Sequence, residues 1–185
     1  MLQIKGSVVL DTVRAVKTRA SEEEYARILS LLDKEARKVF EGEIFSSTWY
    51  SLDAFMNFLE VEIKVLFKGR EEVLIRASEA LIENQLQGIY KAFVKPGAPQ
   101  YVIQRIAAVH ATYFQGVSVE VKMEGPSRAV IRYIGFEKQH RLQEYTLIGF
   151  FRKALEISGA KDVVAEFTTR ISTGTGIAEL WLTWK

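Results

Sequence analysis

His110 is the residue whose type and placement come closest to chemistry in this sequence. It shares a helical spacing with four apolar residues, so we expect its ring to point inward; these are Ile103, Ile106, Ala107 and Phe114. An imidazole on an apolar face can ligate haem iron or another metal, or contact an organic ligand. It can equally be a core histidine that is hydrogen-bonded to a neighbour, and the sequence leaves these interpretations open.

The remaining polar residues form no catalytic constellation. His140 lies in a Lys-Gln-His-Arg connection, which predicts a surface position, and two histidines without cysteine make no zinc ligand set. Residues 173–176 (Thr-Gly-Thr-Gly) lie between two predicted strands and lack the lysine of a phosphate loop, so they predict a hairpin turn. Because no acid, base and nucleophile converge, we expect no catalytic residue, no bound metal and no enzyme activity.

Aromatic residues are the second source of candidates, since the sequence holds 11 Phe, 7 Tyr and 3 Trp. Most should pack in the core. A helical layer facing a small sheet can also leave an apolar pocket, and Gly88 and Gly149 inside predicted helices permit close approach of a backbone or a ligand. We predict that such a pocket is lined by some of five residues: Phe55, Leu59, His110, Tyr113 and Phe151.

The composition indicates an ordinary globular chain. Its 185 residues suit one domain, 48% are hydrophobic, and the net charge of +2 is too small and too interleaved to indicate nucleic-acid binding. The absence of cysteine excludes disulfides and thiol catalysis and is typical of cytoplasmic proteins. We find no secretion leader and no apolar run of about 18 residues, so we expect a cytoplasmic protein without a membrane span.

The last third of the chain predicts two hairpins separated by a helix. Val119, Val121 and Met123 alternate with polar residues, which is typical of a strand with one buried face. A return strand over residues 128–134 and a helix from Leu142 to about Gly159 follow. Two further strands complete a β-β-α-β-β unit, and the last places four residues on one side: Ala178, Leu180, Leu182 and Trp184.

The preceding two thirds predict mostly helices. After a short strand over residues 2–5 we expect helices at five places: residues 7–17, 21–42, 52–68, 70–94 and 99–114. Ser21 and Glu24 have the spacing of a capping box, and residues 46–51 predict a loop. The whole chain, 1–185, therefore predicts one α+β domain, with an N-terminal helical layer on a small antiparallel sheet.

Three stretches carry a resemblance to a known superfamily: residues 46–55 (SSTWYSLDAF), residues 145–151 (YTLIGFF) and the closing strand at residues 177–184. With the order of elements, they resemble the superfamily of haem–nitric-oxide-binding domains, vinyl-reductase-type hydrocarbon-binding domains and small subunits of vesicle-tethering (TRAPP) complexes. Within it, the chain is most similar to a bacterial family first noticed as myxobacterial paralogues. The resemblance implies a non-enzymatic binding domain that is often dimeric.

The resemblance does not extend to a haem site. The haem-binding group has a Tyr-x-Ser-x-Arg signature that grips the haem propionates, whereas this chain has Tyr133, Gly135 and Glu137. A carboxylate beside a propionate is repulsive. We therefore expect no haem and no other cofactor.

Three functions are compatible with the sequence. The first is a cytoplasmic sensory or adaptor domain in signalling that binds a small apolar ligand or a protein partner. The second is a structural interaction module with a filled core, and the third is a haem-based gas sensor. We also predict a homodimer, because four apolar residues should lie on the outer face of the sheet: Val130, Ile134, Ile177 and Trp181.

Overall fold

The computed structural model describes residues 1–86 and 95–185, with the side chains of residues 84–86 left out. Gly88 and the end of the helix predicted over residues 70–94 lie outside this part. The described chain forms two compact units. Unit 1 comprises Met1–Val73 and Tyr113–Gly116, and unit 2 comprises Leu74–Thr112 and Val117–Lys185.

A short antiparallel sheet in unit 1 has the order β2-β1-β3. Its strands are β1 (Gln3–Lys5), β2 (Trp49–Ser51) and β3 (Phe114–Gln115). Ile4 pairs with Tyr50 on one side and with Phe114 on the other, and it is fully buried. The loop predicted over residues 46–51 is therefore wrong at its end, because strands of two or three residues carry no alternation that a sequence can reveal.

The helices of unit 1 agree with the sequence except at one break. They are α1 (Gly6–Arg19), α2 (Glu22–Leu31), α3 (Lys34–Phe40) and α4 (Leu52–Phe67). The capping box of Ser21 and Glu24 is confirmed. The single helix predicted over residues 21–42 is wrong: Leu32 is extended, and Asp33 accepts a hydrogen bond from the Ala36 amide to begin α3. An N-cap aspartate stabilises the start of a new helix, and this outweighed the continuous apolar stripe.

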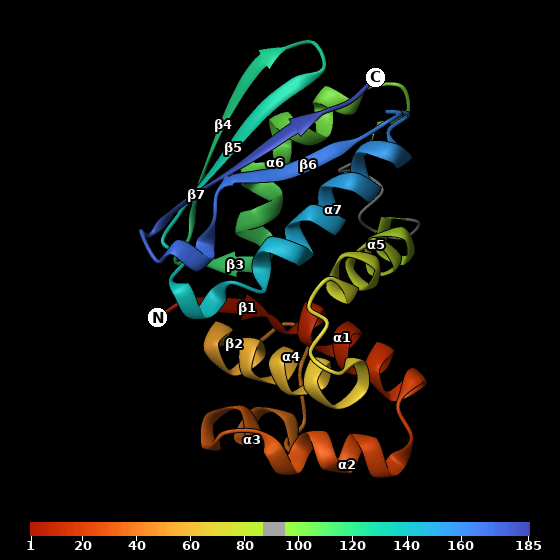
Figure 1. Ribbon diagram of the computed structural model, residues 1–185, viewed down its shortest axis with the longest axis vertical. Coiled ribbons are helices and arrows are strands. Elements are labelled where there is room, and N and C mark those ends of the chain that lie inside the picture. Colours follow the sequence, from red (N-terminus) through yellow and green to blue (C-terminus); the bar gives the residue numbers. More distant parts are fainter. Residues whose placement is uncertain (87–94) are drawn as a thin grey trace. The chain divides into compact units, whose positions relative to one another are not determined.

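The main sheet belongs to unit 2 and has the order β4-β5-β7-β6, with every neighbouring pair antiparallel (Figure 1). Its strands are β4 (Ser118–Gly125), β5 (Arg128–Ile134), β6 (Val164–Thr169) and β7 (Ile177–Thr183). Ala178, Leu180 and Leu182 are buried on the inner face, as predicted. The β-β-α-β-β order and the α+β class are thus confirmed.

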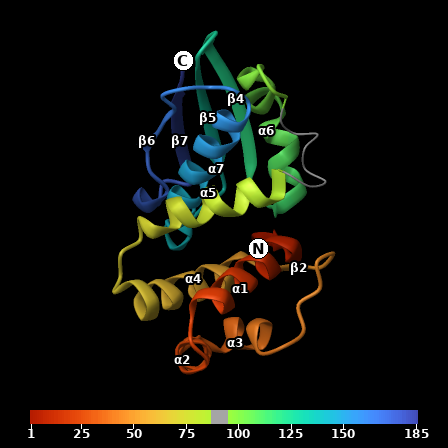
Figure 2. The same cartoon turned by 90° about the vertical axis from the view of Figure 1, so that its right-hand side faces the viewer.

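The helices of unit 2 are α5 (Val73–Leu86), α6 (Pro99–Tyr113) and α7 (Gln143–Ile157). In Figure 2, α7 lies along the inner face of the sheet, with α5 beside it. Gly149 explains this approach, because a Cβ at this position would collide with the carbonyl oxygen of Ile75 on α5. The Ser78 hydroxyl also donates to the Thr146 carbonyl at 2.7 Å. Gly149 therefore admits a backbone, one of its two predicted roles.

A buried carboxylate ties the β6–β7 connection to α7. Glu144 is 2% exposed and accepts hydrogen bonds from the Ser172 amide at 2.8 Å and from the Arg170 guanidinium at 3.1 Å. The turn predicted over residues 173–176 is confirmed, with Gly174 at φ +73°, although a short 3-10 helix, Ile171–Thr173, precedes it. Glu144 thus fixes the turn that sets the pairing of β6 with β7.

None of the helices in residues 1–86 and 95–185 has the length and apolar character needed to cross a bilayer.

A second buried carboxylate, Glu62, lies in unit 1 on α4. It is 3% exposed, and the Arg19 guanidinium at the end of α1 lies 3.5 Å from its carboxylate. Burial raises the pKa of Glu62 from 4.5 to about 7, although Arg19 acts in the opposite direction. The folded pKa therefore lies above the unfolded one, so the protonated form favours the folded state.

Glu62 should make the protein less stable as the pH rises. Its stabilising effect is fully present below the unfolded pKa and is lost as the pH rises through the folded pKa of about 7. Glu62→Gln should abolish this loss and exceed the wild type in free energy of unfolding at about pH 8 by at most about 3 kcal/mol. Urea unfolding across the pH range measures it. Glu41→Gln, at a side chain 55% exposed, is the control and should behave as wild type; an unchanged pH profile in Glu62→Gln would contradict the assignment.

Candidate ligand-binding site

His110 belongs to a group of four rings in unit 2; we call His110, Tyr133, Phe136 and His140 the ring cluster. The His110 ring centroid lies 5.5 Å from that of Tyr133 and 6.2 Å from that of Phe136. Phe136 in turn lies 5.8 Å from Tyr133 and 6.0 Å from His140. All four residues are at most 4% exposed. The four rings are therefore neighbours in the buried interior of unit 2.

Two regular elements supply the centre of the ring cluster. On α6, His110 continues the buried stripe of Val102, Ile103 and Ile106, so the predicted inward orientation is confirmed, although Ala107 of the predicted face is exposed. On β5, Tyr133 occupies an inner-face position between Val119 of β4 and Ala178 of β7. The periods of a helix and a strand thus direct both rings inward.

The turn after β5 supplies the other two rings. Gly135 has φ +114°, where a serine would be strained, and its amide donates to the Gly176 carbonyl at 2.9 Å. The turn brings the Phe136 side chain inward, and the Glu137 amide donates to Nδ1 of His140 at 2.9 Å. The surface position predicted for His140 is therefore wrong: its ring is 1% exposed because it caps a 3-10 turn.

The two central polar groups are uncharged. Burial lowers the pKa of His110 to about 4, so its imidazole is neutral at pH 7. Burial also raises the pKa of Tyr133, which keeps its proton. The Tyr133 hydroxyl is fully buried and has no hydrogen-bond partner among the described residues. An unsatisfied buried hydroxyl is uncommon in folded proteins and calls for an explanation.

The predicted pocket residues divide between the units. In unit 2, His110 and Phe151 are both buried, on α6 and α7. In unit 1, Phe55 and Leu59 are buried one turn apart on α4, and Tyr113 is half-buried where α6 ends. The role of these five residues in ligand binding stays a prediction. Sequence reasoning did not select Phe136 and His140, whose positions depend on an irregular turn without a period.

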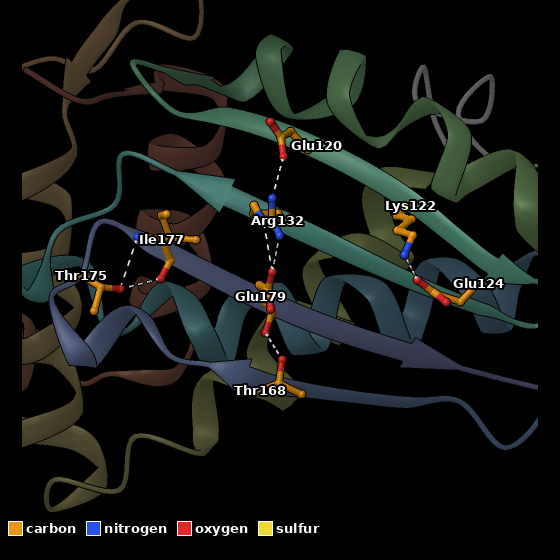
Figure 3. Close-up of polar contacts among 8 residues, drawn as sticks. All are labelled: Glu120, Lys122, Glu124, Arg132, Thr168, Thr175, Ile177 and Glu179. Atoms are coloured by element: carbon orange, nitrogen blue, oxygen red, sulfur yellow. Dashed lines mark hydrogen bonds and ion pairs between the residues drawn. The ribbon is translucent and has the colours of Figure 1, made fainter.

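The four predicted interface residues lie on the outer face of the main sheet, where they form two separate pairs. Val130 pairs with Trp181 and Ile134 with Ile177 across β5 and β7, and Ile177 and Trp181 are 45% and 37% exposed. Between the two pairs, Arg132 joins Glu120 and Glu179, as Figure 3 shows. The predicted apolar patch is thus divided by a charged row.

No family model matches the chain, and no curated protein matches it significantly. Solved structures of H-NOX proteins match almost all of it. A Fe(II) unliganded H-NOX mutant from K. algicida has a TM-score of 0.72 at 12% identity, covering 98% of this chain and 97% of its own. An H-NOX protein from S. oneidensis in the Fe(II)NO ligation state has a TM-score of 0.72 at 13% identity, and the match covers 98% of this chain and 99% of that protein. An oxygen-binding H-NOX domain related to soluble guanylate cyclases has a TM-score of 0.66 at 12% identity, and the match covers 98% of this chain and 95% of that domain.

The chain has the H-NOX fold. This confirms the superfamily resemblance at the level of fold, and at 12–13% identity it extends no further. The narrower resemblance to myxobacterial paralogues stays a prediction.

The residues present do not fit the haem that the resemblance to haem–nitric-oxide-binding domains implies. At the signature positions, the backbone at Gly135 disfavours a serine, and Glu137 is an exposed carboxylate that accepts a hydrogen bond from the Gln139 amide. The rings of Tyr133 and Phe136 lie beside the His110 imidazole and take up the space there. Within residues 1–86 and 95–185, no three His, Asp or Glu side chains are grouped to hold a metal ion.

We expect the purified protein to contain no stoichiometric haem, because Glu137 repels propionates and the rings around His110 are in mutual contact. The visible spectrum after expression with added haem measures this. A sharp Soret band at one haem per chain that disappears in His110→Ala would contradict the expectation. Arg105→Ala, at an exposed position on the same helix, is the control and should leave such a band unchanged.

Proposed function

We propose that this protein is a non-enzymatic sensory domain that binds a small, largely apolar ligand in the interior of unit 2. The observation that carries the proposal is the fully buried Tyr133 hydroxyl, which has no hydrogen-bond partner among the described residues. Leaving such a group unpaired costs about 1–3 kcal/mol, and a bound ligand with a polar atom offsets that cost. The H-NOX fold supports this proposal, since the S. oneidensis H-NOX protein is in an Fe(II)NO ligation state and another H-NOX domain with the fold binds oxygen.

The chemistry around Tyr133 favours an uncharged ligand. His110 is neutral at pH 7, and the neighbouring rings of Tyr133 and Phe136 carry no charge. A carboxylate or phosphate placed here would be a buried charge, and no residue of the ring cluster carries the opposite charge to compensate it. Burying such a charge is costly. An apolar molecule with one neutral polar group suits these surroundings.

A cytoplasmic role in signalling is part of the proposal, supported by a sequence without cysteine. A protein partner remains the other candidate for what the domain binds, and it would act through the surface.

A ligand of the right class should stabilise the protein. Binding only to the folded state at 100 times the dissociation constant adds about 2.7 kcal/mol to the free energy of unfolding. A thermal-shift screen of isoprenoids, fatty alcohols and fatty acids should show a clear upward step for one class. The step should shrink in Tyr133→Phe and persist in Tyr101→Phe, which alters a half-buried tyrosine on α6. A flat screen would instead favour the structural interaction module with a filled core.

We propose further that the protein is a homodimer through the outer face of the main sheet. Support comes from the exposure of Ile177 and Trp181, at 45% and 37%, beside the half-buried Val130 and Ile134. Exposed apolar side chains on a soluble protein commonly mark an interface, and here they form two pairs on either side of the charged row. Two-fold dimers are the commonest closed assembly.

Light scattering tests the homodimer. The wild type should have twice the mass of one chain at high micromolar concentration, and Trp181→Glu with Ile134→Glu should be monomeric because both changes bury a charge in the interface. Phe45→Glu is the control, since Phe45 is 54% exposed but lies in unit 1. A monomeric wild type would rule the dimer out, and a dimer that survives both charges would place the interface elsewhere.

A further inference from the structure

The outer face of the main sheet carries three rows of side chains that run across the strands. The middle row is charged and holds Glu120, Arg132 and Glu179, and one flanking row holds Ile134 and Ile177. The other flanking row has apolar residues at its centre and opposite charges at its ends; in strand order it reads Lys122, Val130, Trp181 and Glu166. The pairing register of four strands thus places charge and apolar surface in a regular pattern.

The charges of the middle row remain accessible in the single chain. Arg132 donates to Glu179 at 2.8 and 3.0 Å and to Glu120 at 3.3 Å, as drawn in Figure 3. Nevertheless, the side chains of Arg132 and Glu120 are 48% and 59% exposed, and that of Glu179 is 27% exposed. The row therefore presents its charges to whatever covers the face.

Two copies of one sheet can stack face to face only about a two-fold axis that lies in the plane between them. If that axis runs along the strands, midway between β5 and β7, each residue on β5 faces the partner copy's residue in the same row of β7. Val130 then faces Trp181, Ile134 faces Ile177, and Arg132 faces Glu179. On the outer strands, Lys122 faces Glu166. Every one of these contacts is either apolar on apolar or opposite in charge.

Other axis positions create mismatches. An axis across the strands at the middle row places Arg132 against its own copy and Glu179 against its own copy. An axis along the strands between β4 and β5 places Lys122 against Val130 and leaves Trp181 outside the contact. Like charges in an interface and a charge on an apolar side chain are both unfavourable. Of these three axes, the one between β5 and β7 alone places no like charges opposite each other and no charge against Val130, Trp181, Ile134 or Ile177.

We propose that two copies of this chain stack through the outer face about a two-fold axis that runs along the strands between β5 and β7. Each Arg132 then bridges Glu179 of its own chain and Glu179 of the partner subunit, and each Trp181 packs on Val130 of the partner subunit. This geometry rests on the proposed homodimer and specifies which residues meet in it. Trp181, a large aromatic residue near the centre, is the expected anchor of the contact.

Complementary charge changes test the contact between Arg132 and Glu179. Arg132→Glu alone places two carboxylates opposite each other, and Glu179→Arg alone places two guanidinium groups opposite each other. Each variant should self-associate at least about tenfold more weakly than the wild type. An equimolar mixture of the two should recover a heterodimer by native mass spectrometry, because the partners then carry opposite charges. If both variants dimerise like the wild type, the proposed contact is wrong.

The absence of cysteine allows a clean test of the axis by single pyrene labels. Arg128 and Thr183 end the outer face of β5 and β7, and Glu124 lies at the same end on β4. About the proposed axis, a label on β5 or β7 lies about 5 Å sideways from its own copy, but a label on β4 lies about 14 Å away. Arg128→Cys and Thr183→Cys should therefore give pyrene excimer fluorescence, and Glu124→Cys should not.

The outcomes separate the geometry from the dimer itself. A monomeric wild type removes both proposals. A dimer without excimer at Arg128→Cys and Thr183→Cys, under conditions where light scattering shows both labelled variants to be dimeric, overturns the axis alone. Excimer from Glu124→Cys but not from Arg128→Cys would shift the axis to β4 and likewise overturn the proposal.

Discussion

The antiparallel register between β5 and β7 is the constraint on which the rest of unit 2 depends. It pairs Tyr133 with Ala178 on the inner face and Arg132 with Glu179 on the outer face. A slip of one residue would turn Tyr133 to solvent and Arg132 into the core. The same pairing therefore supplies both the buried hydroxyl beside His110 and the charged row across the outer face.

Buried polar groups in this protein fall into two kinds. Glu144 receives hydrogen bonds from Ser172 and Arg170, and His140 receives one from Glu137, so both stabilise turns. Glu62, beside the partly exposed Arg19, has its pKa raised by burial. The Tyr133 hydroxyl has no hydrogen-bond partner in the described structure. Hydrogen-bonded groups such as Glu144 and His140 help to specify the fold. Buried polar groups without full compensation are commonly found at functional sites.

The comparison with H-NOX proteins establishes a likeness of fold, and the residues at the expected haem-binding positions differ. The chain matches them over 98% of its length, yet two of the three positions of the expected propionate-binding signature hold Gly135 and Glu137. Gly135 provides a backbone conformation with φ +114°, and Phe136 fills the space beside His110. Fold and function are separable because packing constrains many residues weakly, whereas a cofactor site depends on a few residues strongly.

The sequence by itself determined the elements whose period is long enough to repeat. The alternation in β4, the buried face of α7 and the inward orientation of His110 all follow from local periodicity, which depends only on neighbouring residues. Only the tertiary structure decided the burial of His140, the break at Asp33 and the strand at Trp49–Ser51. The burial of His140 depends on how a turn packs, and the strand depends on a pairing partner far along the chain. At the break, the Asp33 amide donates to Asn57 on α4, 24 residues away. The contacts of the Tyr133 ring likewise require residues from α6 and from the turn after β5 to meet, which no spacing within one segment encodes.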